Sequence, residues 1–383
     1  MSVTLPKGFV AAGVAAGLKS SGKPDVAVVV NQGPGMSAAA VFTSNRVQAA
    51  PVKWSRQVTA DGQVQAVVLN SGGANACTGS PGFEDAAATA AHAAELLRLP
   101  ADNVAVCSTG LIGIRLPMPE LLTGVEAAVG ELSAEGGASA ARAIMTTDSV
   151  PKEAGATRDG WSVGGMAKGA GMLAPGLATM LVVLTTDADV EPAALDRALR
   201  AATRVTFDRA DSDGCMSTND TVVVLASGAS GIRPSDDELA AALTEVSADL
   251  ARQLIHDAEG AHHDIAIEVV GAATEADAET VGREIARSNL FKCAVFGNDP
   301  NWGRVLSAIG VTDAEFDPDL LDVSFNGVMV CRGGQIGEDR SLVDLGPRDV
   351  HVLVDLHAGD ATATILTNDL TYDYVRENAE YSS

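Results

Sequence analysis

The segment that could carry nucleophilic chemistry reads KGAGMLAPGLATMLVVLTTD, residues 168–187. A glycine-rich approach ends at Ala178, and Thr179 then opens an apolar run that is typical of a buried strand. Threonine favours strands, so strand propensity alone also explains this position. If the peptide bond before Thr179 is cut, however, the new terminal amine has an unperturbed pKa of about 7.7 to 8.0 and can accept the hydroxyl proton. The segment therefore raises the hypothesis of a self-cleaved threonine nucleophile.

A second segment, VCSTGLIG at residues 106–113, could stabilise negative charge in such a reaction. It runs from a strand into a turn of small residues, where the Thr109 hydroxyl and the Gly110 backbone N–H could face an oxyanion. An ordinary strand-ending turn would look the same. The loops in 210–224 and 296–310 are also rich in polar residues and glycine, and such loops on a rigid sheet often hold functional sites.

Other catalytic motifs fit poorly. GLKSSGKP at residues 17–24 resembles a phosphate-binding loop, but Pro24 stands where a hydroxyl must reach Mg²⁺. His262 and His263 are adjacent without ligand spacing, so a solvated or packed pair is favoured over a metal site. No GxSxG elbow occurs, which indicates that the base of an acyl-transfer reaction is not histidine.

The composition limits the class of protein. The chain has 383 residues, 46% of them apolar, and a formal net charge of -24, which argues against nucleic acid as a partner. No stretch approaches the run of about 20 apolar residues that a membrane span requires, and the start of the chain lacks the features of a secretory signal. Five scattered cysteines without CxxC spacing indicate reduced thiols in a cytoplasm.

The elements that must position these residues alternate between apolar strands and alanine-rich helices. Asn326-Gly327 predicts a tight hairpin turn, and Ser235 is a plausible N-cap of the longest helix. The periodicity predicts one interwoven α/β body. The expected strands cover residues 26–31, 38–43, 66–70, 104–107, 180–184, 221–228, 264–272, 322–330 and 350–366. The expected helices cover residues 82–99, 117–132, 191–205, 235–261 and 274–289, with a short one before residue 144.

Several segments, taken in order, resemble the ornithine acetyltransferase family of arginine biosynthesis, whose members are also called bifunctional glutamate N-acetyltransferases. The resemblance runs from GFVAAGVAAGLK to the last residue. It implies an α/β fold of two stacked β-sheets flanked by helices, like that of the N-terminal-nucleophile aminopeptidases. The segments are KGAGMLAPGLATML, AIMTTD, CSTGLIG, STNDTV, EGA, GNDPNWGRVLSAIG and DLTYDYVRENAEYSS.

The resemblance also implies an activity. Family members cut themselves at the bond matching Ala178–Thr179, here giving an α chain of residues 1–178 and a β chain of residues 179–383, and they assemble as α₂β₂ heterotetramers. In a ping-pong reaction, N²-acetylornithine acetylates the threonine and glutamate then takes the acetyl group. Some members also use acetyl-CoA. The family needs no metal or cofactor.

The resemblance assigns roles to matching residues. Thr179 would be nucleophile and, through its amine, base, and Thr109 and Gly110 would form the oxyanion pair. The remaining substrate contacts would be Thr146, with Thr147 as the close alternative, Lys168, Glu259, Asn378 and Ser383. Arg304 could help to admit glutamate. The chain departs from the family pattern at Gly73, at His262-His263 and at its terminal serine.

Two other classes of function remain open at this point. An autoprocessed aminopeptidase or amidohydrolase would use water in place of glutamate as the acceptor. A non-enzymatic binding protein would never cut itself. The sequence also leaves open the use of acetyl-CoA, inhibition by arginine and service in a secondary pathway.

Overall fold

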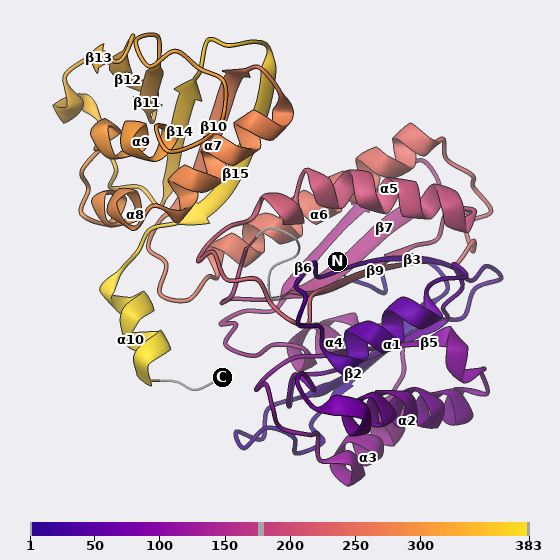
Figure 1. The fold of residues 1–383 in the computed structure, drawn as a ribbon. Helices are drawn as coiled ribbons and strands as arrows, with labels where there is room; N and C mark the ends of the chain where they lie inside the picture. The colour runs from indigo at the N-terminus through magenta and orange to yellow at the C-terminus, as the bar shows by residue number, and fades with distance from the viewer. Residues whose placement is uncertain (1, 175–179, 381–383) are drawn as a thin grey trace. The chain divides into compact units, whose positions relative to one another are not determined.

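The computed structural model describes residues 2–174 and 180–380 (Figure 1). The chain divides into two compact units. Among the described residues, the N-terminal unit runs to Asp208 and resumes over Cys215–Leu254, and the C-terminal unit contains Arg209–Gly214 and residues 255–380. This division does not follow the expected fragments 1–178 and 179–383, so those fragments and the single interwoven body stay predictions.

Two sheets form the centre of the N-terminal unit. Most of their inner strands are runs of valine, alanine and leucine that are fully buried, as expected for strands covered on both faces. The first sheet has the order β1 (Phe9–Val14), β2 (Val26–Asn31), β4 (Ala66–Asn70) and β5 (Val104–Ser108). The second has the order β3 (Ser37–Phe42), β9 (Thr221–Ala226), β8 (Leu181–Thr186), β7 (Ser162–Lys168) and β6 (Lys152–Thr157).

Helices cover these two sheets on the outside. Val28 and Leu69 of the first sheet share one apolar core with Leu181 and Val223 of the second. On the outer side of the first sheet lie α2 (Gly79–Leu97) and α3 (Met118–Gly130), and over the second lie α5 (Pro192–Arg204) and α6 (Asp236–His256) (Figure 1). Two shorter helices, α1 (Ala50–Val58) and α4 (Gly137–Ala143), pack against β5 and β1 respectively. The predicted α/β fold of stacked sheets flanked by helices is confirmed.

The C-terminal unit has one mixed sheet with helices on one face. Its strands alternate between buried and partly exposed residues, because only that face is covered. The strand order is β13 (Gln335–Ile336), β12 (Val328–Arg332), β11 (Asp322–Phe325), β14 (Asp349–Asp355), β10 (Asp264–Ala272) and β15 (Ala361–Asn368). The helices are α7 (Glu275–Arg287), α8 (Asn289–Phe296), α9 (Trp302–Ile309) and the terminal α10 (Tyr372–Glu380). Across the described residues, no helix is long and apolar enough to cross a lipid bilayer.

The local sequence signals predicted most of these elements. Strands β2, β4 and β10 match their predicted bounds, and the Asn326-Gly327 hairpin is present with positive φ at both residues. The sequence missed β1 and also the pair β6 and β7, whose KEAGAT and SVGGMAK are rich in residues that disfavour strands. Thr179, the predicted first residue of a strand, lies outside the described residues; the strand itself begins at Leu181.

Candidate active site

Strand register places the chemistry at one end of the second sheet. Lys168, the last residue of β7, pairs with Leu181, the first residue of β8, and Leu181 pairs with Thr221 of β9. Met180, the first described residue after the expected cleavage position, therefore lies at the end of the sheet where Lys168 lies. Ala178, Thr179 and Ser383 fall outside the described residues.

The predicted contact residue Lys168 meets the predicted oxyanion residue Thr109. The Lys168 Nζ atom donates to Thr109 Oγ1 at 3.4 Å, and both residues are almost fully buried. The Thr109 N–H donates to the carbonyl oxygen of Asn70 at 3.0 Å, which extends the pairing of β5 with β4 by one residue. The structure thus joins the end of the first sheet to the end of the second through a cation and a hydroxyl.

The turn after Thr109 requires glycine. Gly110 has φ of +132°, a conformation that L side chains rarely adopt. A Cβ atom there would lie 2.9 Å from the Cα of Gly73. Gly73 is also the position at which the chain departs from the asparagine common in the resembling family. Two glycines in contact thus let the backbone turn tightly beside Thr109.

Asp148 connects this region, and the sequence reasoning did not single it out. Its carboxylate accepts from Lys152 Nζ at 2.6 Å, from the Gly169 N–H at 2.7 Å and from the Thr146 N–H at 2.9 Å. Burial raises the pKa of Asp148, but the positive charges of Lys168 and Lys152 outweigh that effect, and the pKa falls to about 2. Asp148 therefore stays ionised and holds Thr146 and the residue after Lys168 in place.

The segment that resembles a phosphate loop uses its donors internally. The backbone N–H groups of Ala16, Leu18 and Lys19 all donate to the carboxylate of Asp25. The ammonium of Lys19 donates to the carbonyl of Met145 at 2.7 Å. Burial is the main cause that lowers the pKa of Lys19 to about 8, and the nearby positive charge of Lys168 adds to it. The loop thus supplies a half-buried amine that lies close enough to Lys168 for the two charges to interact.

The STNDT segment contributes two buried groups. Asn219 donates through Nδ2 to the carbonyl oxygens of Ala74, at 2.6 Å, and Ser108, at 2.8 Å, so it ties the two sheets together. Asp220 Oδ1 accepts the N–H of Met180 at 3.0 Å. Burial raises the pKa of Asp220 well above its ordinary value. The Asp220 carboxyl group thus holds the start of the strand that follows Thr179.

In the C-terminal unit, two further predicted contacts meet. Asn378 Nδ2 donates to Glu259 Oε2 at 3.1 Å. Glu259 also lines a cavity of about 180 Å³ with Arg287 and Lys292. The Lys292 ammonium donates to the Ser212 carbonyl, and burial lowers the pKa of this lysine. The cavity thus offers a carboxylate for an amine and cations for an acid group.

The histidine pair is held by carboxylates. His262 Nε2 lies 2.8 Å from Asp373 Oδ2, and buried His263 lies 2.7 Å from Asp369 Oδ2 through Nδ1. In the described parts of the chain, no group of three or more His, Cys, Asp or Glu side chains could hold a metal ion. Arg304 donates to the carbonyl of Leu290, and its predicted role in admitting glutamate stays a prediction.

Known proteins with similar sequences identify the family of this chain. A model of the ArgJ family matches residues 10–383. The chain belongs to the ArgJ family. It is 68% identical, with both chains fully covered, to "Arginine biosynthesis bifunctional protein ArgJ" of Streptomyces coelicolor. It is 57% identical to the protein of that name from Mycobacterium leprae, covering all of this chain and 96% of the relative. A solved ornithine acetyltransferase from Mycobacterium tuberculosis, complexed with ornithine, is 56% identical over 47% of this chain and 96% of its own, with a TM-score of 0.45.

Membership in the ArgJ family confirms two predictions made from the sequence. The chain is an enzyme, an acyltransferase of arginine biosynthesis, and the resemblance of its motifs to that family is confirmed along the chain. The described site residues fall into two sets. Thr109, Gly110, Thr146 and Lys168 belong to the N-terminal unit, and Glu259 and Asn378 to the C-terminal unit.

Proposed function

We propose that this ArgJ-family chain cuts itself between Ala178 and Thr179 and then transfers an acetyl group from N²-acetylornithine to glutamate through an acyl-threonine. The observation that carries the proposal is the buried contact of Lys168 with Thr109, at the end of the sheet where Met180 lies. Family membership supports the same reaction class.

The first half-reaction forms the acyl-enzyme. The Thr179 hydroxyl oxygen attacks the acetyl carbonyl carbon, and the terminal amine of Thr179 takes the hydroxyl proton. The Thr109 hydroxyl and the Gly110 N–H stabilise the oxyanion of the tetrahedral intermediate. The C–N bond then breaks, and the proton passes to the departing nitrogen, which releases ornithine.

The second half-reaction reverses these steps with another amine. The α-amine of glutamate attacks the acetyl-threonine ester, its proton returns through the Thr179 amine to the hydroxyl, and N-acetylglutamate leaves. Lys168 supplies a positive charge for an α-carboxylate, and Glu259 accepts hydrogen bonds from a substrate amine. Thr146, Asn378 and Ser383 make the other substrate contacts. Asp148 positions Thr146 and the residue after Lys168, because it bonds to both Thr146 and Gly169.

Autoproteolysis can be tested directly. Denaturing electrophoresis of purified protein should show two fragments in place of the 39.0 kDa chain, with the second beginning at Thr179. Thr179→Ala should stay uncut and inactive, because it lacks the hydroxyl that attacks. Thr179→Ser, which keeps a hydroxyl, should still be cut. Intact chain in fully active protein would contradict the proposal.

The acceptor distinguishes a transferase from a hydrolase. Protein incubated with labelled N²-acetylornithine and glutamate should form labelled N-acetylglutamate in amounts that match the ornithine released. If free acetate is formed instead, water is the acceptor. A parallel assay with acetyl-CoA and glutamate determines whether the enzyme is bifunctional.

The assembly and location belong to the same proposal. The α and β fragments would form an α₂β₂ heterotetramer in the cytoplasm, with no metal or cofactor. Native mass spectrometry of the processed protein should give twice the summed mass of the two fragments. A mass equal to one pair of fragments would contradict the heterotetramer.

A further inference from the structure

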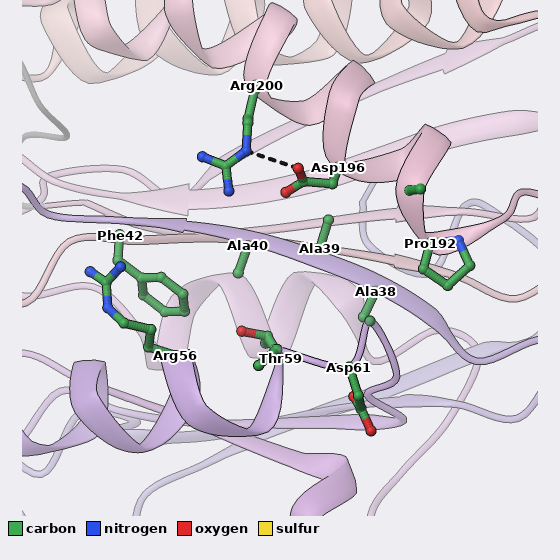
Figure 2. A pocket seen from close by; sticks show the side chains of 13 residues that line it. Ala38, Ala39, Ala40, Phe42, Arg56, Thr59, Asp61, Pro192, Asp196 and Arg200 are labelled. Carbon is green, nitrogen blue, oxygen red and sulfur yellow. Dashed lines mark hydrogen bonds and ion pairs between the residues drawn. The ribbon is translucent and has the colours of Figure 1, made fainter.

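A cavity lies along the outer edge of β3, away from the proposed catalytic residues. It has a volume of about 450 Å³, within the range of small-molecule pockets. One wall is the end of α1 with the turn that follows it, and the other is the start of α5 (Figure 2). β3 is the edge strand of its sheet, and β9 lies between it and β8. The cavity is therefore separated by two strands from β8, the strand that follows Met180.

The floor of this cavity is an unpaired strand edge. β3 is the first strand of its sheet and pairs with β9 on one side, and on the other side, among the described residues, it forms a bridge only between Ser37 and Gln63. The N–H of Ala38 donates to Gly62 on the open side, so the N–H and C=O groups of Ala40 and Phe42 also point there, since direction alternates along a strand. In the described chain these groups of Ala40 and Phe42 make no hydrogen bond. They can therefore pair with an amide of a ligand.

Two arginines stand on opposite walls near the Phe42 end of this edge. Figure 2 shows Arg200 reaching from α5 on one side of β3 and Arg56 from α1 on the other. Arg56 lies 4.9 Å from the centre of the Phe42 ring and has no carboxylate partner within the described residues. The chain has only 26 lysines and arginines against 50 acidic residues, yet two guanidinium groups line this one cavity.

The acidic residues of the cavity leave these cations available. Asp196 bonds to Arg200 through Nε at 2.9 Å, and in the described residues the two terminal nitrogens of Arg200 have no other hydrogen bond. Asp61 lies toward Ala38, at the other end of the edge from Phe42 (Figure 2), and accepts the N–H of Gln63. A carboxylate at the Phe42 end would therefore meet two cations before it met an anion.

From this arrangement we infer that the cavity is a second ligand site, which binds a small carboxylate with a secondary amide beside it, as in an N-acylated amino acid. The carboxylate would lie between Arg56 and Arg200. The amide would extend the sheet by hydrogen bonds to the free N–H and C=O groups of Ala40. The inference holds whatever reaction the enzyme performs, because none of these residues belongs to the proposed catalytic set.

The probe for this site is N-acetyl-L-aspartate, measured by isothermal titration calorimetry on the processed enzyme. Arg56→Gln and Arg200→Gln should each weaken binding by about tenfold or more, since a charge-assisted bond to the ligand is lost. Arg197→Gln is the matched control. Arg197 lies on α5, as Arg200 does, but it pairs with Asp236 and does not line the cavity. It should bind as the wild type does.

Two further measurements test the position and the amide. Phenylglyoxal modification followed by mass mapping should show that the probe protects Arg56 and Arg200 but not Arg197. Ala40→Pro removes an N–H that β9 does not use, so the fold should survive while binding falls. L-Aspartate, which has no acyl amide, should bind about tenfold or more weakly.

Specific results would overturn the inference. These are no saturable binding by the wild type up to about 10 mM probe, a range that covers very weak ligands, or unchanged affinity in the Arg56→Gln/Arg200→Gln double variant. Binding without protection of the two arginines would place the ligand elsewhere. Equal affinity for L-aspartate would refute the role of the amide. Circular dichroism of each variant separates lost binding from lost folding.

Discussion

At the scale of single residues, the site depends on buried ions that hold one another. Asp148 and Lys152 form an ion pair at 2.6 Å with both side chains fully buried. Lys168 is also buried, and its positive charge helps to lower the pKa of Asp148. Such charges are stable only when paired and hydrogen-bonded, which is why one carboxylate with several donors organises this region.

The removal of the Asp148 charge should destabilise the protein. Asp148→Asn removes the charge of one partner of a fully buried ion pair and should lower the free energy of unfolding by about 3 to 5 kcal/mol. The matched control is Glu245→Gln, which breaks the exposed pair with Arg158 and should cost about 1 kcal/mol or less. Equal losses in the two variants, measured by denaturant unfolding at pH 7, would contradict this account.

The lowered pKa of Asp148 should make the stability of the folded protein sensitive to acid. The pKa of Asp148 is lowered in the folded protein from 3.8 to about 2. Its stabilisation, on the order of 2 kcal/mol, is therefore complete above the unfolded pKa and is lost as the pH falls from about 4 to about 2. In Asp148→Asn this part of the pH dependence should be missing. Unfolding curves of both proteins across that pH window provide the measurement.

Thr109 should matter for chemistry more than for folding. Thr109→Ala removes one oxyanion donor, and acyl transfer or processing should slow by about 10² to 10³. Thr109→Ser keeps the hydroxyl and should retain most of the rate. Steady-state rates with N²-acetylornithine and glutamate test this, and an unchanged rate in Thr109→Ala would remove Thr109 from the site.

At the scale of elements, the strands position the site and the helices stabilise them. The sheet ends near Thr109 and Lys168 are fixed by register, because a shift of one residue would reverse every side chain. The longest helix, α6, begins with a capping box in which Ser235 and Glu238 bond reciprocally. This helix packs over β7, since a Cβ atom at Gly165 would touch its Val246 and Leu250.

The Ser235 cap of α6 should contribute to the stability of the protein. Ser235→Ala removes the hydroxyl that accepts the Glu238 N–H and should cost about 1 kcal/mol of stability. Ser235→Asp keeps a capping acceptor and should restore most of it. Thermal unfolding followed by circular dichroism measures both. A loss as large in Ser235→Asp as in Ser235→Ala would contradict the cap.

At the scale of the whole molecule, charge is the dominant property. The formal net charge of -24 creates self-repulsion among surface carboxylates, while the lysines of the site are buried. A negatively charged substrate therefore reaches local positive groups inside a protein that repels it at long range. Lys168 is such a group in the interior, and the arginines of the β3 cavity are positive groups at the surface.

Salt should therefore stabilise the protein as a whole. Screening shortens the reach of repulsion from about 30 Å at 0.01 M ionic strength to about 8 Å at 0.15 M. The melting temperature should rise over that range with sodium chloride, as measured by differential scanning calorimetry. Most of the rise should occur at the low end, where screening changes most. A melting temperature that falls with salt would show that attractive pairs outweigh the repulsion.

The sequence by itself determined the local elements and the reaction class. Periodicity and turn residues are local, so they predicted β2, β4, β10 and the Asn326-Gly327 hairpin, and the motifs around Thr179 pointed to the right family. Tertiary structure decided the rest. Thr109 meets Lys168 across 59 residues and Glu259 meets Asn378 across 119, and no local pattern encodes such contacts. The roles of Asp148 and of the β3 edge likewise depend on which distant groups surround them, because burial and unpaired edges are properties of the packed chain.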